Sequence, residues 1–361
     1  MPIPPLYGHE GTRNRLVGAI ASGRLPQALL FEGPRGVGKQ RLALWLAQAL
    51  VCEKAGEKAG GEGKAGRWEP CGVCQPCRLV QNLSHPDVHW FVPLELTKKT
   101  GDADKQVDVA EEALTAEMAV RREQPLYEAP SGVAIHGIAA VRLLLRRLTL
   151  KPVLGRRKVF VIGDAERLVP QVGAEAAANA LLKALEEPPP ETVFILTASA
   201  PDALLPTILS RVVRVRVARL ADSIVAAFVQ RELGVPGQRA VAQRVAVSGG
   251  CIGRVLAEGD GQDRSGQAAE RFAAAVKAGP ATRYAFALGQ QPFQARGGFT
   301  EMLDGLLERL REQARSGEET GRVVRSIAQV LEARTLAQGN VNPQLVAAVL
   351  GGDWEGGGEP T

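Results

Sequence analysis

Residues 33–40 have a spacing that could bind the phosphates of a nucleotide. They are Gly33-Pro34-Arg35-Gly36-Val37-Gly38-Lys39-Gln40. The pattern G-x-x-x-x-G-K-[ST] surrounds a triphosphate with backbone N–H groups and one lysine at the positive end of a helix. Its last residue normally carries a hydroxyl that ligates Mg²⁺, and here that residue is the amide Gln40. An apolar strand at 28–31 and an apolar helix start at 41–47 give the loop its usual setting, so we predict a nucleotide-binding type of fold.

Four cysteines are spaced as metal ligands. Cys71, Cys74 and Cys77 form two consecutive C-x-x-C steps, and Cys52 precedes them at the end of the predicted helix. Zn²⁺ prefers four soft ligands in a tetrahedron, which this set supplies. The alternative interpretation is a redox pair with two bystander cysteines. The intervening loop 53–70 is rich in Gly, Lys and Glu, and we expect it to be disordered.

The bulk composition is that of an ordinary globular protein. The chain has 361 residues, of which 45% are hydrophobic and 23% charged, and this length suggests two or three domains. A net charge of +5 and a pI near 9.0 are compatible with contact to a polyanion but too small to demonstrate it. The N-terminus lacks an apolar signal core, and no apolar run approaches the roughly 18 residues of a membrane span. We therefore expect a cytoplasmic protein with no membrane association and no disulfides.

Strand and helix signals alternate through residues 1–217. The apolar runs 159–162 and 192–197 are typical of strands in a buried parallel sheet. Residues 95–131 are mostly polar and are interpreted as an insertion, with a weak helix through 109–120. The strand signals stop near residue 218, and helices separated by Gly and Pro follow to about residue 350. The Gly- and acid-rich tail 351–361 is predicted to be disordered.

Several motifs, in order along the chain, resemble one family. They are Gly8-His9-Glu10, Leu25–Phe31, Gly33–Lys39, the cysteine motif, His85-Pro86-Asp87, Lys151-Pro152, Asn179–Pro189 and Ile208–Arg211. Together they resemble the AAA+ clamp-loader subunits of bacterial DNA polymerase III, and among these the delta-prime subunits. The resemblance covers residues 6–255 apart from two insertions. The string Asn179–Pro189 and the cysteine motif are specific to the family, whereas the phosphate loop alone is not.

The resemblance implies an α/β fold and a set of partners. An AAA+ P-loop domain with a parallel sheet is expected over 1–217, with a zinc module at 52–77 and the polar insertion 95–131. A small helical lid domain would follow over 218–262, and an all-α collar domain for oligomerisation over 266–350. The implied partners are motor subunits of the gamma/tau type, a delta-type subunit, the sliding clamp and primer–template DNA.

The resemblance also implies that the positions that motor subunits use for ATP hydrolysis are altered in this chain. Motor subunits carry an Asp-Glu pair after the second core strand, to hold the Mg²⁺ shell and to position the attacking water. Here Gly163 takes the first place and Asp164 the second. Shifting the alignment by one residue would restore Asp164 as the metal ligand, but it would not restore the hydroxyl lost at Gln40. Ser199 fits the polar position that contacts the γ-phosphate.

A third alteration lies in the helical lid. Gly253 stands where motor subunits place an arginine, and Arg254 is displaced by one residue, about 100° around a helix. Because three elements of hydrolysis are damaged together, we predict that the chain does not turn over ATP. Nucleotide can still be held by the cradle Gly36–Lys39, so ATP stays a possible ligand.

One catalytic element of the family is retained. Ser210-Arg211-Val212 occupies the S-R-C position, which implies that Arg211 acts in trans on ATP bound by a neighbouring subunit, as a planar cation suited to phosphoryl charge. The alternative is a surface arginine that begins a basic run. For the basic residues Arg142, Arg146, Arg147 and 156–158 we weigh contact with DNA phosphates against a solvated face, and favour the latter.

The function predicted is that of a non-hydrolysing subunit of the DNA polymerase III holoenzyme. It would help load the ring clamp onto primed DNA and complete the ATP site of a neighbour. Two alternatives stay open, namely an active ATPase subunit of the same assembly and a free-standing AAA+ DNA-binding module.

Overall fold

The computed structural model describes most of the chain as two compact units. The described residues are 3–56, 68–95, 102–126, 134–155, 157–169, 175–259, 264–291, 298–316, 320–338 and 341–354. The first unit extends to Ala257 and the second begins at Glu258. Predictions that concern residues 57–67, 96–101, 127–131, 260–263, 355–361 and Arg156 lie outside the described residues.

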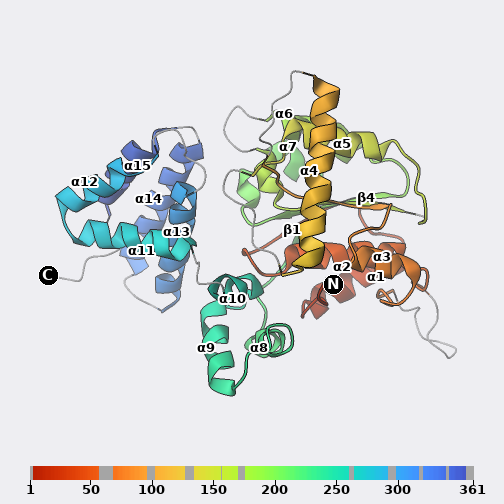
Figure 1. Cartoon of the computed structure of the whole chain (residues 1–361), viewed down its shortest axis with the longest axis horizontal. Coiled ribbons are helices and arrows are strands. Elements are labelled where there is room, and N and C mark those ends of the chain that lie inside the picture. The colour runs from red at the N-terminus through yellow and green to blue at the C-terminus, as the bar shows by residue number, and fades with distance from the viewer. Residues whose placement is uncertain are drawn as a thin grey trace. The chain divides into compact units, whose positions relative to one another are not determined.

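A five-stranded parallel sheet forms the centre of the first unit (Figure 1). Its strands are β1 (Ala28–Glu32), β2 (Val88–Phe91), β3 (Lys158–Ile162), β4 (Thr192–Ala198) and β5 (Val213–Arg216). They lie in the order β2-β3-β4-β1-β5, and each neighbouring pair is parallel. Strands β3 and β4 are buried along their whole length, as the apolar runs predicted, because helices cover both faces of such a sheet. The order places the carboxyl ends of β3, β4 and β1 side by side.

Helices connect and cover these strands. They are α1 (Glu10–Ala21), α2 (Lys39–Val51), α3 (Gln75–Gln81), α4 (Ala103–Glu123), α5 (Ile138–Leu148), α6 (Ala176–Glu186) and α7 (Pro206–Leu209), with short 3-10 helices at Ala165–Leu168 and Pro201–Ala203. Helix α2 packs on β1, β3 and β4. Most of its residues are buried, from Lys39 at its start to Val51 at its end, so α2 is the central helix of this unit.

The polar segment contains a longer helix than the sequence predicted. Helix α4 runs over 21 residues, compared with the weak helix expected at 109–120. Asp102 caps it by accepting a hydrogen bond from the backbone N–H of Asp104 at 3.0 Å. Val107, Ala110 and Leu114 are buried, a spacing of three and four residues that forms one helical stripe. This stripe explains why α4 packs against α5 in spite of its polar composition (Figure 1).

Among the described residues, three helices complete the first unit and five form the second. The former are α8 (Asp222–Arg231), α9 (Gln238–Ser248) and α10 (Ile252–Gly259), and the latter are α11 (Arg264–Lys277), α12 (Pro280–Leu288), α13 (Gly298–Ser316), α14 (Thr320–Gln338) and α15 (Pro343–Gly352). Val225, Phe228 and Val255 belong to an apolar cluster of α8–α10 that is separate from the core of the sheet. The second unit has a core of its own. Within the described ranges, no helix has both the length and the apolar character needed to cross a membrane.

A buried carboxylate explains the His-Pro-Asp motif. Asp87 is fully buried, and its carboxylate accepts hydrogen bonds from the backbone N–H groups of Val153 (2.6 Å), Leu154 (2.8 Å) and Gly155 (2.7 Å). Burial alone would raise the pKa of Asp87, but the three N–H donors outweigh it and hold that pKa below its ordinary value. The side chain thus fixes the loop between α5 and β3.

We predict that Asp87→Asn lowers the free energy of unfolding by about 2 kcal/mol, because an amide cannot replace a carboxylate that accepts three backbone N–H groups. Asp202→Asn, at an exposed aspartate, is the control and should be close to neutral. The folded-state pKa of Asp87 is depressed, so its contribution is complete above the unfolded value of about 3.9 and disappears as the pH falls through the folded value. Urea unfolding at neutral and acidic pH measures this. A difference between wild type and Asp87→Asn that is unchanged in acid would contradict the assignment.

Candidate functional site

The phosphate loop joins β1 to α2 at the carboxyl edge of the sheet. Gly38 is the N-cap of α2 and has a positive φ of 99°, and Lys39 is the first helical residue. The side chain of Val37 is fully buried, so only its backbone can face a ligand. The turn after β3 and the end of β4 bring Asp164 and Ser199 to the same edge, which is where parallel α/β sheets bind ligands.

The ammonium group of Lys39 is fully engaged within the protein. Its side chain is buried, and Nζ donates hydrogen bonds to the carbonyl oxygens of Gly33 (2.9 Å) and Pro34 (2.8 Å) and to Oγ of Ser199 (2.8 Å). An ammonium has three N–H donors, so all three have protein acceptors. Burial lowers the pKa of Lys39, while the nearby carboxylates of Glu166 and Asp164 act in the opposite direction. A phosphate group would have to displace at least one of these acceptors.

Gln40 and Gly163 fit one another. A Cβ atom at Gly163 would lie 2.7 Å from Oε1 and 2.9 Å from Cδ of Gln40, so the glutamine amide fills the space beside this glycine. Nε2 of Gln40 donates a hydrogen bond to Oδ2 of Asp164 at 3.0 Å. Asp164 has a positive φ of 49°, and its backbone N–H donates to Oγ1 of Thr197 at 3.1 Å. The Gln40 amide therefore occupies the side-chain space of residue 163 and holds the carboxylate of residue 164.

Gly253 contacts the phosphate loop directly. Its backbone N–H donates to the carbonyl oxygen of Gly36 at 2.9 Å, and a Cβ at Gly253 would lie 2.5 Å from Cα of Gly36. Any side chain at residue 253 would push α10 away from the loop. The guanidinium of Arg254 lies beside Gly249, 3.1 Å from where a Cβ of that glycine would be.

Two residues that support the site were not predicted from the sequence. Glu166 accepts a hydrogen bond from the backbone N–H of Ser199 at 3.0 Å, and burial together with the carboxylate of Asp164 raises the pKa of Glu166. His136 is buried, and its Nε2 donates to the carbonyl oxygen of Gly163 at 2.7 Å. Burial lowers the pKa of His136 to about 4, so the ring is neutral at pH 7. An isolated histidine after an apolar run was the one sequence signal for it.

A second histidine supports the loop from the N-terminal side. Nε2 of His9 donates to the carbonyl oxygen of Val37 at 2.8 Å, and burial lowers the pKa of His9. The Gly8-His9-Glu10 motif thus fixes the loop backbone between Gly36 and Gly38.

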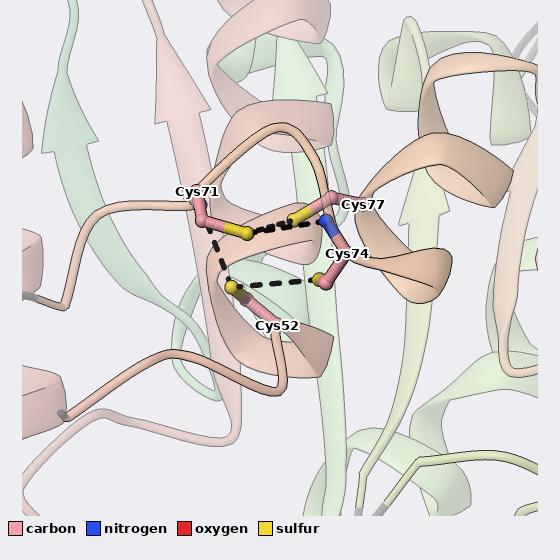
Figure 2. A group of neighbouring side chains, drawn as sticks. All are labelled: Cys52, Cys71, Cys74 and Cys77. Atoms are coloured by element: carbon pink, nitrogen blue, oxygen red, sulfur yellow. Dashed lines mark hydrogen bonds between the residues drawn. The ribbon is translucent and has the colours of Figure 1, made fainter.

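The four predicted metal ligands converge on one point (Figure 2). The sulfur atoms of Cys52, Cys71, Cys74 and Cys77 all lie within 4.8 Å of one another. Sγ of Cys71 is 3.9 Å from Sγ of Cys77, and Sγ of Cys74 is 3.9 Å from Sγ of Cys52. These separations are nearly twice the disulfide length of about 2.05 Å, so the thiols are free, and their convergence favours a ligand set over a redox pair with bystanders.

The environment of the cysteine cluster assists ionisation at one sulfur. Burial opposes ionisation of Cys71, but the backbone N–H groups of Val73 and Cys74 outweigh it, and the pKa of Cys71 is lowered to about 6. Burial raises the pKa of Cys52 and of Cys77. A bound cation would stabilise the remaining thiolates, since the thiolate is the form that ligates metal.

The cysteine cluster is attached to the central helix. Cys52 is the C-cap of α2, and Nε2 of Gln48 in that helix donates to the carbonyl oxygen of Cys77 at 3.0 Å. Arg13 of α1 pairs with Glu69 at 2.7 Å and lies over the ring of Trp45 in α2. The cluster and the phosphate loop therefore lie at opposite ends of α2.

Arg211 lies on the surface after α7 and is not brought to the phosphate loop. Its guanidinium forms an ion pair with Glu186, at the end of α6. Of the basic run that follows it, Arg214 pairs with Glu32 at 2.6 Å.

The basic residues near α5 have different environments. Arg146 pairs with Asp108 and Glu111, and Arg147 pairs with Glu111. Lys158 is buried, and its Nζ donates to the carbonyl oxygens of Arg147 and Leu150. Lys158 therefore belongs neither to a DNA-contacting surface nor to a solvated face, so both interpretations were wrong for this residue. Arg142, in contrast, is exposed.

Comparison with known proteins identifies the relatives of this chain. The family described as DNA polymerase III, delta subunit, matches residues 8–221. The chain is 30% identical over 244 residues to the delta-prime subunit of DNA polymerase III from Escherichia coli, a match that covers 67% of this chain and 57% of that protein. It is 32% identical over 207 residues to the gamma/tau subunit from Mycobacterium tuberculosis, covering 57% of this chain and 27% of that protein.

These relatives are longer than the matched region, and two kinds of subunit match at similar identity. The chain spans little more than half the length of the Escherichia coli protein. Among solved structures, a DNA polymerase III gamma subunit-related protein from Thermotoga maritima is 18% identical with a TM-score of 0.41, and the match covers 95% of this chain and 97% of that chain.

We predict that the cysteine cluster binds one metal ion per chain. Cys74→Ser should lower the metal content sharply and destabilise the segment around α3, because a three-thiolate set holds the ion less tightly. Cys251→Ser, at the buried cysteine outside the cluster, is the control and should retain the metal. Elemental analysis of protein purified under reducing, chelator-free conditions measures this. Metal-free wild-type protein would contradict the prediction.

Proposed function

This chain belongs to the DNA polymerase III delta-subunit family, and we propose that it serves as the non-hydrolysing subunit of the clamp loader. In this role it helps load the ring-shaped sliding clamp onto primed DNA in the cytoplasm. Its neighbours are motor subunits of the gamma/tau type and a delta-type subunit. The curated relatives carry the names of delta-prime and of gamma/tau subunits, so the choice between the two rests on the site.

The observation that carries the proposal is the contact between Gln40 and Gly163. Hydrolysis needs a hydroxyl at the end of the loop and a carboxylate after β3 to hold Mg²⁺. The Gln40 amide takes the space that a carboxylate at residue 163 would need, and it also binds the carboxylate of Asp164. The hydrogen bond between Gln40 and Asp164 therefore stands where a Mg²⁺ site would be expected.

Two further contacts support the same conclusion. Lys39 has protein acceptors for all its N–H donors, so the cradle is stable without a phosphate. Gly253, which by the family resemblance stands where motor subunits place an arginine of the helical lid, packs on Gly36. If a nucleotide binds to the Gly33–Lys39 loop, its phosphate oxygens would accept hydrogen bonds from the backbone amides of the loop and from Lys39.

The alternative is an active ATPase subunit of the same assembly. Lys39, Asp164 and Ser199 have the residue types that a motor subunit uses, and this favours the alternative. It requires the Gln40–Asp164 hydrogen bond to break, so that Asp164 can hold a metal without help from residue 40.

We assign the cysteine cluster to structural Zn²⁺. Four sulfur atoms at about 2.3 Å from a central Zn²⁺ are separated by roughly 3.8 Å in a tetrahedron. The Cys71–Cys77 and Cys74–Cys52 sulfur separations of 3.9 Å are close to this value. Four thiolates leave no open position on Zn²⁺, which is the arrangement of a structural rather than a catalytic site.

The proposed contribution to catalysis is Arg211. It is half-buried on the surface after α7, so a neighbouring subunit can approach it. A guanidinium placed against the γ-phosphate of a neighbour's ATP stabilises the charge that develops during phosphoryl transfer.

We expect the isolated protein to show no ATPase activity above background, with or without DNA, because Gln40 and Gly163 leave Mg²⁺ without its usual ligands. Phosphate release by the purified chain measures this, and Lys39→Ala is the control for contaminating ATPases. Turnover in wild type that Lys39→Ala abolishes would favour the motor alternative. Nucleotide binding without turnover is compatible with the proposal.

We expect Arg211→Ala to leave the fold and ring assembly intact while lowering DNA-dependent ATP turnover and clamp loading by the reconstituted complex. Arginine fingers contribute roughly 10³–10⁵ in rate at the site that they serve, although in a ring with several ATP sites the overall loss is smaller. Arg211→Lys should recover little, since an ammonium cannot reproduce the planar fork. Arg216→Ala, at an exposed arginine of the same basic run, is the control. Unaltered loading by both Arg211 variants would reduce Arg211 to a surface residue.

A further inference from the structure

The family motif Asn179–Pro189 includes a carboxylate to which the proposed function gives no role. Glu186 is the last residue of α6. A carboxylate there faces the negative end of the helix dipole, which is an unfavourable placement without a nearby cation. The cation that it meets is Arg211, which lies 25 residues further along the chain.

The contact between these two side chains involves one edge of the guanidinium. Nε of Arg211 donates to Oε1 of Glu186 at 2.8 Å, and Nη2 donates to the same oxygen. One carboxylate oxygen thus accepts from both donors of the Nε–Nη2 edge, which holds that edge at the end of α6.

The opposite side of the guanidinium is held by α7. Nη1 of Arg211 donates to the carbonyl oxygen of Thr207 at 2.6 Å and to Oγ of Ser210 at 3.3 Å. Four of the five N–H donors of a guanidinium are therefore engaged, by the ends of two helices. Arg211 is restrained although its side chain is 27% exposed.

We propose that Glu186 is the positioning residue for Arg211. It holds the guanidinium against the ends of α6 and α7, so that a phosphate group on a neighbouring subunit meets a side chain that is already ordered. An exposed arginine without such a partner samples many rotamers, and ordering it upon contact reduces the gain from that contact. This inference rests on the proposed role of Arg211 in trans.

The pair is also weak enough to be exchanged. Exposed ion pairs are screened by solvent and contribute little to stability. The phosphate can therefore displace the Glu186 oxygen or share the guanidinium with it, and the loss of Glu186 should affect the order of Arg211 more than the fold.

The test is a set of variants in the reconstituted clamp loader, with primed DNA, sliding clamp and ATP. Glu186→Gln should lower DNA-dependent kcat for ATP about two- to fivefold, the size expected from the loss of one exposed ion pair, with an unchanged KM for ATP. Glu187→Gln is the matched control, since it removes the adjacent exposed carboxylate, for which the described part of the chain shows no ion pair. Thermal stability of the two variants should be alike.

The double variant Glu186→Gln with Arg211→Ala gives the readout that a structural role would not produce. It should be no slower than Arg211→Ala alone, because Glu186 acts only through Arg211. A Glu186→Gln rate equal to or above that of wild type, or a double variant slower than Arg211→Ala, would overturn the inference and leave the role of Arg211 intact. A normal rate for Arg211→Ala would overturn the role of Arg211 and the inference with it.

Discussion

The first unit is organised around a buried ammonium that needs acceptors. An unpaired charge inside a protein costs several kcal/mol, and Lys39 at the start of α2 avoids this cost with three acceptors. Two of them belong to the loop after β1, and the third is Ser199 after β4. Ser199 is in turn bound by Glu166, in the turn after β3. The carboxyl ends of three neighbouring strands are therefore linked around one cation, and the shape of the loop follows from these links.

Gln40, Gly163 and Gly253 are the three residues that differ from the motor-subunit pattern. In the structure they take part in two packing contacts. Gln40 and Gly163 occupy one space, because the amide lies where a side chain of residue 163 would begin. Gly253 lies against Gly36 with no room for a Cβ. A side chain introduced at residue 163 would collide with Gln40, and one introduced at residue 253 would collide with Gly36. The phosphate loop, the turn after β3 and the start of α10 are thus fitted to one another, which suits a subunit that keeps its shape while its neighbours bind and release nucleotide.

Much of this fold could be predicted from the sequence. The parallel sheet and the clamp-loader family were predicted from apolar runs and ordered motifs, and both predictions are confirmed. The supporting residues could not be found in this way, because His136, Glu166 and Glu186 act on partners that are distant in sequence or defined by the turn after β3. Helix α4 was predicted too short because its buried stripe is narrow and most of its residues are charged or small. The domain boundaries and the roles of the site residues stay predictions.

The position of Cys52 directly after α2 has a mechanical consequence. Lys39 begins this helix and Val51 ends it, so thirteen residues with a rise of about 1.5 Å each place the cysteine cluster roughly 20 Å from the phosphate loop. An ion held by Cys52 and the three other thiolates would anchor the far end of α2. The helix could then not slide along its axis or turn about it without straining a metal–sulfur bond. The ion would thereby limit movement of α2 along its axis. The position of the phosphate loop at the start of α2 would then depend on the metal site at the other end of the helix.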